Sequence, residues 1–246
     1  MDRQQQEIRW LLEEKYGGLR TKEFEEDLKK LEAGEHIAYL IGFVEFLGAR
    51  IDLSLRPLIP RPETEFWTEQ AIAELQKRSG TLRIMDAFAG SGSVGVAFGK
   101  HVPNALVEFL EKDSRMREEI QKNLDLNNID ERRALIVPSD VFSGASGEYD
   151  AILANPPYVD EKLLTDEERE ALSREPKEAL FAPEDGFFFV REVLENAPKF
   201  LKPGGVLYCE MQENHGPRAQ NYANLYREFG IGEDQYGKPR FIRAVW

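Results

Sequence analysis

A short run of unusual composition, Asn155-Pro156-Pro157-Tyr158, follows an apolar segment, Tyr149 to Ala154, that predicts a buried strand. Two consecutive prolines remove two backbone N–H donors and fix two φ angles, which leaves a stiff row of carbonyl groups beside an amide and an aromatic ring. The Asn155 side chain and the Pro156 carbonyl can both accept hydrogen bonds from a small N–H donor, such as an amino or carboxamide group. The alternative is a turn that ends the strand, because Asn and Pro are common turn residues.

A glycine-rich segment is the second candidate for chemistry: Asp86-Ala87-Phe88-Ala89-Gly90-Ser91-Gly92 lies between a predicted strand and a predicted helix. Glycine lets a backbone approach a ligand closely, and the N-terminus of a helix directs N–H groups toward it. Similar turns occur in dinucleotide sites, so the segment alone does not identify the ligand. We expect Asp86 and Phe88, Ala89, Gly90, Ser91 and Gly92 to contact a cofactor.

The next two predicted strands also end in polar residues. The second ends in Glu111, where a carboxylate can accept hydrogen bonds from both hydroxyls of a ribose. A plain polar loop from Glu111 to Asp113 is the alternative. After the third strand, Asp140 is placed to accept the adenine amino group and Val141 to pack on the ring. Because ligands of open parallel sheets bind beyond the carboxyl ends of the strands, we expect these residues to share one crevice with Asn155.

Alternating strands and helices begin at residue 82. The strand candidates are Leu82 to Asp86, Leu106 to Leu110, Ala134 to Val137, Tyr149 to Ala154 and Val206 to Glu210. The helices expected among them are Ser93 to Lys100, Ser114 to Leu126 and Phe187 to Phe200, with a further helix near Arg218 to Phe229. Two last strands, Ile231 to Tyr236 and Phe241 to Trp246, read as an antiparallel pair. This order predicts an α/β fold with a doubly wound, mostly parallel, seven-stranded sheet.

The N-terminal third has a different pattern. Residues 4–15 and 22–33 predict two short helices, which cannot bury a core of their own and must pack on the next segment or on a partner. Residues 36–56 predict a β-hairpin, and Pro62 begins a helix whose positive end favours Glu63 and Glu65. We therefore expect a helical extension over 1–35, a hairpin linker over 36–56 and the main domain over 57–246.

Composition limits the classes of partner. The 246 residues carry a formal charge of −13, which disfavours stable nucleic-acid binding and favours a protein or small-molecule partner. One cysteine, Cys209, rules out a disulfide framework, and the three histidines have no metal-ligand spacing. No apolar run reaches the length of a membrane helix, and the N-terminus lacks a signal-peptide pattern. We expect a cytoplasmic protein without a metal, and a monomer.

A long segment, Val159 to Asp185, separates a predicted strand from the following helix. Thr165-Asp166-Glu167-Glu168 is a capping-box pattern that predicts a short helix within it. Loops of this length beside a site are often lids or substrate-binding elements. The alternative to a lid is an acidic loop that lies in solvent and has no role at the site.

Taken together, the glycine-rich turn, Glu111 and the Asn155–Tyr158 run resemble the class I S-adenosylmethionine-dependent methyltransferases, in the branch that methylates amide or exocyclic amino nitrogens. Upstream and downstream motifs sharpen the resemblance to the release-factor glutamine N5-methyltransferases, the HemK/PrmC family. These motifs are Ala38-Tyr39-Leu40-Ile41-Gly42, Leu58-Ile59-Pro60-Arg61-Pro62-Glu63-Thr64-Glu65, and Glu175-Pro176 before Ala179-Leu180. The resemblance runs from about residue 20 to the end of the chain.

This resemblance implies roles for individual residues. It assigns Phe88 to Gly92 and Glu111 to the methionine and ribose parts of S-adenosyl-L-methionine, and Asp140 and Val141 to its adenine. Asn155 to Tyr158 would surround a target glutamine of a release factor, with Asn155, Pro156 and Tyr158 as the catalytic set, and Asn155 would also contact the cofactor. The family usually has Gly in place of Phe88 and Asp in place of Glu111. Its helical N-terminal domain, which helps to dock the release factor, is longer than the helices expected here.

The expected mechanism is positional. The Asn155 side-chain oxygen and the Pro156 carbonyl would accept the two N–H groups of the target amide, and Tyr158 would wall the pocket. Three alternatives share parts of the pattern: an adenine N6 methyltransferase acting on DNA or RNA, a ribosomal-protein glutamine methyltransferase, and a non-catalytic relative that binds the cofactor. The acidic charge and the Leu58–Glu65 motif favour a protein glutamine over a nucleobase.

Overall fold

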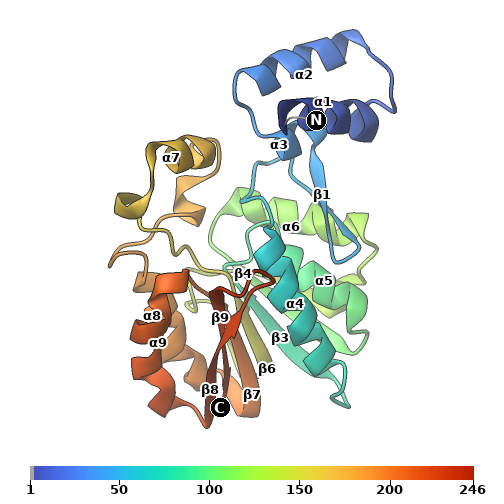
Figure 1. Cartoon of the computed structure of the whole chain (residues 1–246). Coiled ribbons are helices and arrows are strands. Elements are labelled where there is room, and N and C mark those ends of the chain that lie inside the picture. The colour runs from blue at the N-terminus through green and yellow to red at the C-terminus, as the bar shows by residue number, and fades with distance from the viewer. Residues whose placement is uncertain (1–2) are drawn as a thin grey trace.

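Seven strands form one mostly parallel sheet in the computed structural model, which describes residues 3–246 (Figure 1). Their order across the sheet is β5-β4-β3-β6-β7-β9-β8, in which β9 runs antiparallel to both of its neighbours, β7 and β8, and the other neighbouring pairs are parallel. The strands are β3 (Leu82–Ala87), β4 (Ala105–Glu111), β5 (Ala134–Pro138), β6 (Tyr149–Ala154), β7 (Leu201–Glu210), β8 (Glu228–Glu233) and β9 (Pro239–Val245). The predicted fold class and strand number are confirmed.

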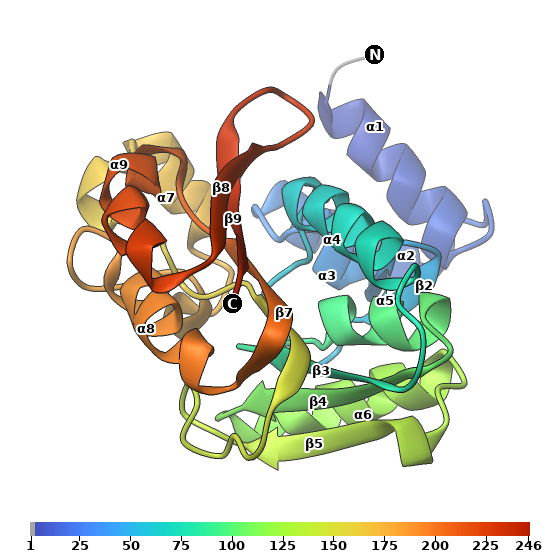
Figure 2. The ribbon, with the colours of Figure 1, turned by 90° about the horizontal axis from the view of Figure 1, so that it is seen from below.

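Helices cover both faces of this sheet (Figure 2). One face packs on α4 (Pro62–Leu75), α5 (Ser93–His101) and α6 (Ser114–Leu126) through a core that includes Trp67, Phe98 and Phe109. The other face packs on α8 (Phe188–Asn196) and α9 (Gly216–Ala219) through Met85, Val190 and other buried residues. Strand order reverses between β3 and β6, so the carboxyl ends of these two neighbours flank the switch point where ligands of such sheets bind.

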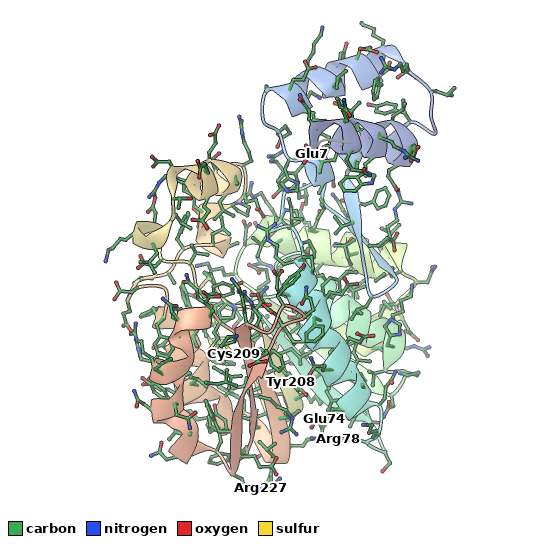
Figure 3. The ribbon with its side chains drawn as sticks, in the orientation of Figure 1. Glu7, Glu74, Arg78, Tyr208, Cys209 and Arg227 are labelled. Carbon is green, nitrogen blue, oxygen red and sulfur yellow. The ribbon has the colours of Figure 1, made fainter. Side chains whose placement is uncertain are left out.

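Polar side chains fasten α4 to the antiparallel end of the sheet. Glu74 and Tyr208 lie near each other (Figure 3), and Glu74 accepts a hydrogen bond of 2.7 Å from the Tyr208 hydroxyl. Arg243 donates to both carboxyl oxygens of Glu74. Trp67 lies about two turns before Glu74 on the same helix and stacks on Tyr208, with ring centroids 6.1 Å apart. The helix that begins at Pro62 is therefore held firmly over β7, which fixes the position of its first turn at the carboxyl edge of the sheet.

The N-terminal elements build a small apolar cluster of their own. It joins α1 (Arg3–Trp10), a π-helical turn (Leu11–Lys15), α2 (Lys22–Glu32) and α3 (Ile37–Ile41). As expected, the first two helices pack on the next segment. The start of the predicted hairpin was wrong, because His36 caps a helix and Gly42, at φ 94°, ends it. The hairpin itself is β1 (Phe43–Phe46) and β2 (Ala49–Asp52). The division of the chain at residues 35 and 56 stays a prediction.

The helix expected over Arg218 to Phe229 is shorter than the sequence pattern indicates. The helical backbone continues from α9 only as a 3-10 turn to Leu225, and β8 begins at Glu228. Tyr226 is buried and donates a hydrogen bond to the Leu194 carbonyl, while Glu228 pairs with Val245 of β9. Tertiary packing and strand pairing therefore override the helical periodicity at this point.

Residues 3–246 contain neither a membrane-spanning helix nor a cluster of metal ligands. Within that range no helix combines the length and the apolar character that crossing a bilayer requires. The same range holds no group of three or more His, Cys, Asp or Glu side chains arranged to bind a metal ion.

A buried carboxyl on α6 predicts a pH-dependent stability. Glu119 is fully buried, its oxygens make no short hydrogen bond among the described residues, and Lys122 Nζ forms a longer ion pair of 3.6 Å with Oε2. Burial, aided by the nearby charge of Asp52, raises the pKa of Glu119 to about 7. The folded protein therefore holds a proton that the unfolded chain releases at lower pH, so stability falls as pH rises from about 4.5 through about 7.

We expect Glu119→Gln to increase the free energy of unfolding by about 1–3 kcal/mol at pH 8 and by much less at pH 5, because the amide is never ionised. Urea titrations at the two pH values measure this difference. Glu118→Gln, at the exposed neighbouring position, serves as the control and should leave both values nearly unchanged. A gain that is equal at both pH values would contradict the assignment to Glu119 ionisation.

Candidate functional site

A cavity of about 360 Å³ lies at the carboxyl edge of the sheet. This volume is within the range of about 300–1,000 Å³ that is usual for small-molecule sites. Ten of the residues predicted as site residues line it: Asp86, Phe88, Ala89, Gly90, Ser91, Glu111, Asp140, Val141, Asn155 and Pro157. The other three, Gly92, Pro156 and Tyr158, do not. The glycine-rich turn and the Asn155 run, which are the two predicted halves of the site, thus line the same cavity.

The glycine-rich turn is shaped by backbone hydrogen bonds to Glu111. Gly90 N donates to one carboxyl oxygen of Glu111 at 2.9 Å, and Asp113 N donates to the other at 2.8 Å. Gly90 has φ 55°, a conformation that glycine adopts without steric cost. Gly92, at φ 78°, is the N-cap residue of α5, and an added Cβ there would lie 3.1 Å from Ile120. Glu111 therefore organises the turn and also presents its carboxylate to the cavity.

Two carboxyl groups of the cavity wall sit in a poorly solvated environment. Burial raises the pKa of Asp86 to about 8, with a hydrogen bond from Gly95 N acting in the opposite direction. Burial also raises the pKa of Glu111, against the effect of its two backbone donors. Both groups would gain from a cation in the cavity, because an opposite charge favours the ionised carboxylate. These two acceptors thus suit a ligand that combines hydroxyl groups with positive charge, as S-adenosylmethionine does.

Phe88 occupies a strained position in this wall. Its φ is 60°, in the left-handed region that residues with a Cβ rarely adopt. Its half-buried ring meets the Phe189 ring edge to face, with centroids 5.6 Å apart, and both rings line the cavity. The backbone strain is therefore offset by aromatic packing, and the pair presents an electron-rich surface to whatever fills the cavity.

We expect Phe88→Gly and Phe88→Ala to weaken binding of S-adenosylmethionine about five- to tenfold, the size of a lost cation–π contact of about 1 kcal/mol. The two variants should differ in stability, with Gly more stable than Ala by about 1 kcal/mol, since only Gly relieves the left-handed strain. Calorimetry and thermal unfolding measure these effects. Unchanged or tighter cofactor binding in both variants would show that the ring does not contact the cofactor.

The Asn155 run is held by hydrogen bonds to two residues that were not predicted as site residues, Thr64 and Glu210. Asn155 Nδ2 donates to Thr64 Oγ1 at 3.2 Å, and the Tyr158 hydroxyl donates to Glu210 at 2.7 Å. Tyr158 is not among the residues that line the cavity, and its role as a wall of the substrate pocket stays a prediction. Two signals were present in the sequence: Glu210 ends an apolar strand, as Glu111 does, and Thr64 lies in the Leu58–Glu65 motif.

The long segment after the Asn155 run completes one side of the cavity through Pro176, Glu178 and Ala179. Its buried Glu175 forms an ion pair with Arg61 and accepts a hydrogen bond of 3.1 Å from Ile59 N. The segment thus packs directly on the Leu58–Glu65 motif. The predicted capping box at Thr165 is confirmed and begins α7 (Asp166–Leu172).

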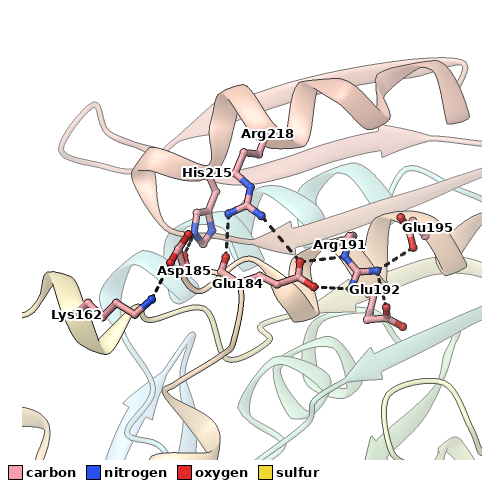
Figure 4. Close-up of polar contacts among 8 residues, drawn as sticks. All are labelled: Lys162, Glu184, Asp185, Arg191, Glu192, Glu195, His215 and Arg218. Atoms are coloured by element: carbon pink, nitrogen blue, oxygen red, sulfur yellow. Dashed lines mark hydrogen bonds and ion pairs between the residues drawn. The ribbon is translucent and has the colours of Figure 1, made fainter.

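The return of this segment to the sheet is tied down by a polar cluster (Figure 4). Arg191 binds both carboxyl oxygens of Glu184, Arg218 donates to the Glu184 carbonyl at 2.9 Å, and His215 lies 3.1 Å from the Asp185 carbonyl. Gly186 follows at φ 82° and passes so close to Tyr158 that an added Cβ would lie 2.1 Å from its carbonyl oxygen. The end of the segment and the Asn155 run therefore hold each other in place.

Comparison with known proteins links this geometry to a defined group. A family model described as the methyltransferase small domain matches residues 67–190. The release factor glutamine methyltransferase of Bacteroides thetaiotaomicron is 32% identical over 231 residues, with 92% of this chain and 81% of the relative covered. That of Thermodesulfovibrio yellowstonii is 34% identical over 191 residues, covering 77% and 68%. A methyltransferase structure from Pyrococcus furiosus, 18% identical, matches with a TM-score of 0.57 over 80% of this chain and 88% of that one, which supports the fold alone.

Proposed function

The chain belongs to the family of release factor glutamine methyltransferases, and on this premise we propose that it transfers a methyl group from S-adenosyl-L-methionine to the side-chain amide nitrogen, N5, of a glutamine in a peptide chain release factor. The proposed acceptor is the glutamine of a Gly-Gly-Gln tripeptide. We further propose that the protein acts in the cytoplasm and as a monomer.

One observation carries the proposal. The same cavity is lined by the glycine-rich turn with Glu111, which suits a nucleoside, and by Asn155, which suits an amide. A nucleotide-binding protein without transfer chemistry would need only the first set. The meeting of both sets in one cavity favours a reaction between the two ligands, since closely held reactants gain up to about 7–11 kcal/mol from positioning.

The residues of the first set are assigned by their chemistry. We assign Glu111 to the ribose hydroxyls, because its carboxylate oxygens retain lone pairs beyond those used by Gly90 and Asp113. Asp86, with the turn from Phe88 to Gly92, is assigned to the positively charged methionine part. Asp140 and Val141, which also line the cavity, are assigned to the adenine.

An amide nitrogen is a weak nucleophile because its lone pair is delocalised into the carbonyl group. When bound, S-adenosylmethionine supplies an electrophilic methyl group whose transfer leaves the electron pair of the broken bond on sulfur and one amide proton to be released to water. The chain's own task is to orient the nitrogen. We assign this task to the Asn155 side-chain oxygen, whose residue lines the cavity, and to the carbonyl of the adjacent Pro156 as the second acceptor, although Pro156 itself is not among the lining residues.

A nucleobase substrate is the main competitor, because an adenine amino group offers N–H donors similar to those of an amide. The net charge of −13 and the acidic segment over the cavity oppose the approach of a phosphate backbone. Three cations at the cavity wall, Arg56, Lys112 and Arg115, are too few to reverse that balance.

Methyl transfer from labelled S-adenosylmethionine tests the proposal directly. We expect label in a release factor and none in DNA, RNA or ribosomal proteins under the same conditions. A release factor whose Gly-Gly-Gln glutamine is replaced by glutamate is the matched control and should remain unlabelled. Label in nucleic acid, or equal label in the control, would overturn the assignment of the substrate.

A further inference from the structure

The amide of Asn155 has two possible orientations, and only one of them suits the proposed reaction. With its oxygen toward the cavity it can accept an N–H of a substrate amide, whereas with its NH₂ group there it would meet another donor. In the structure, Nδ2 donates to Thr64 Oγ1 at 3.2 Å. No group among the described residues donates a hydrogen bond to Oδ1 of Asn155, so this oxygen is left for a ligand.

Thr64 is in turn bound to a buried carboxylate. Its hydroxyl lies 2.7 Å from Glu210 Oε2, which also accepts from the Trp67 indole at 2.7 Å, while Glu210 Oε1 accepts from the Tyr158 hydroxyl at 2.7 Å. Glu210 is fully buried and Thr64 is 2% exposed, so water does not compete for these bonds. We refer to Glu210, Thr64, Trp67 and Tyr158 as the Glu210 network.

The donor and acceptor roles in this network follow from the chemistry of its members. An indole nitrogen can only donate, and an ionised carboxylate can only accept. Burial raises the pKa of Glu210, and its three hydrogen bonds and the nearby Arg240 act in the opposite direction. The direction of the Thr64 bond therefore rests on geometry, because Glu210 Oε2 receives the Trp67 N–H, which can only donate, and accepts the Thr64 hydroxyl hydrogen beside it. Once the Thr64 hydroxyl hydrogen points to Glu210, the Thr64 oxygen has only lone pairs to offer Asn155. It must therefore receive Nδ2, and the Asn155 oxygen is turned to the cavity.

We infer that Thr64 and Glu210 are positioning residues for methyl transfer, which act by fixing the orientation of the Asn155 amide. This inference rests on the proposed function for its catalytic consequence. The hydrogen-bond geometry on which it stands is independent of the identity of the substrate.

Substitutions at Thr64 test the inference, because two near-isosteres separate the hydroxyl from the side-chain shape. Thr64→Val keeps the shape and removes the hydroxyl, so we expect kcat for the glutamine substrate to fall at least about tenfold, with KM and cofactor affinity almost unchanged. Thr64→Ser keeps the hydroxyl and should retain kcat within about threefold. Glu210→Gln, whose amide can donate to Thr64 and reverse the order of donors, should resemble Thr64→Val.

A double-mutant cycle separates positioning from a general structural effect. In the Asn155→Ala background, Thr64→Val should cause no further loss of kcat, because the group that it orients is gone. Equal losses in Thr64→Val and Thr64→Ser, no loss in Thr64→Val, or a further loss in the Asn155→Ala background would each overturn the inference. Thermal unfolding and cofactor calorimetry on every variant establish that each variant is folded and binds the cofactor before its kcat is compared with that of the wild-type protein.

A measurement without turnover distinguishes failure of this inference from failure of the proposed function. In ¹⁵N-labelled, cofactor-free protein, the side-chain NH₂ signals of Asn155 are identified by their loss in Asn155→Ala. We expect their hydrogen exchange to be faster in Thr64→Val than in the wild-type protein or Thr64→Ser. Exchange that is the same in all three would overturn the inference. A wild-type protein that shows the expected exchange but methylates no glutamine would instead refute the proposed function.

Discussion

Asn155→Ala is expected to lower kcat for glutamine methylation by about 10²–10³, the loss typical of removing one positioned hydrogen-bonding group from an active site. The reason is that Asn155 presents the side-chain acceptor assigned to the target amide, while its backbone neighbours remain stiffened by two prolines. Binding of S-adenosylmethionine should change little, because Glu111 and the glycine-rich turn lie on other strands. Single-turnover kinetics and calorimetry measure the two quantities separately.

The matched control is Asn221→Ala, at an exposed position in the 3-10 turn that follows α9. It should leave kcat and cofactor affinity unchanged. Near-normal methylation by Asn155→Ala with intact cofactor binding would contradict the assignment of Asn155, whereas loss of cofactor binding would place this residue in the cofactor site instead.

Gly186→Ala is expected to impair both stability and turnover. An added Cβ would lie 2.1 Å from the Tyr158 carbonyl oxygen, which is backbone and cannot move without displacing the Asn155 run. The left-handed φ of 82° adds a cost of about 1–2 kcal/mol. We expect the free energy of unfolding to fall by about 2–4 kcal/mol and kcat to fall at least about tenfold, because small displacements in an active site are costly.

Gly237→Ala supplies the control for backbone strain alone. Gly237 has φ 75° in the turn between β8 and β9, and an added Cβ would meet no atom within 4 Å. Its loss of stability should be limited to about 1–2 kcal/mol, with kcat unchanged. If the two variants behave alike, close contact between Gly186 and Tyr158 is not what holds the Asn155 run in place.

Much of the fold could be predicted because local signals and tertiary structure agree. The apolar run Tyr149–Ala154 and the helix Ser114–Leu126 have the predicted bounds, since each carries its hydrophobic pattern between clear end signals. The strand-end rule also placed Glu111, Asp140 and Asn155 at one edge of the sheet, where all three line the cavity. Topology, more than any single motif, brings these residues together.

What escaped prediction depends on contacts between distant parts of the chain. Thr64 and Glu210 are 146 residues apart in sequence, and no local pattern indicates that they share a hydrogen bond. The hydrogen bond between the Tyr158 hydroxyl and Glu210 could not be predicted for the same reason, because Glu210 lies on β7, 52 residues further along the chain. Phe88 could be noticed as a departure from the usual glycine, but its partner Phe189 lies on α8 and is known only from packing.

The most direct test of the account is to locate the methyl group on the product. A release factor is incubated with this protein and S-adenosylmethionine, digested, and sequenced by tandem mass spectrometry. The account predicts the mass of one added methyl group on the glutamine of the Gly-Gly-Gln tripeptide, on its side-chain nitrogen, and none after Asn155→Ala. An unmodified glutamine despite demonstrated cofactor binding, or a methyl group on another residue, would contradict it.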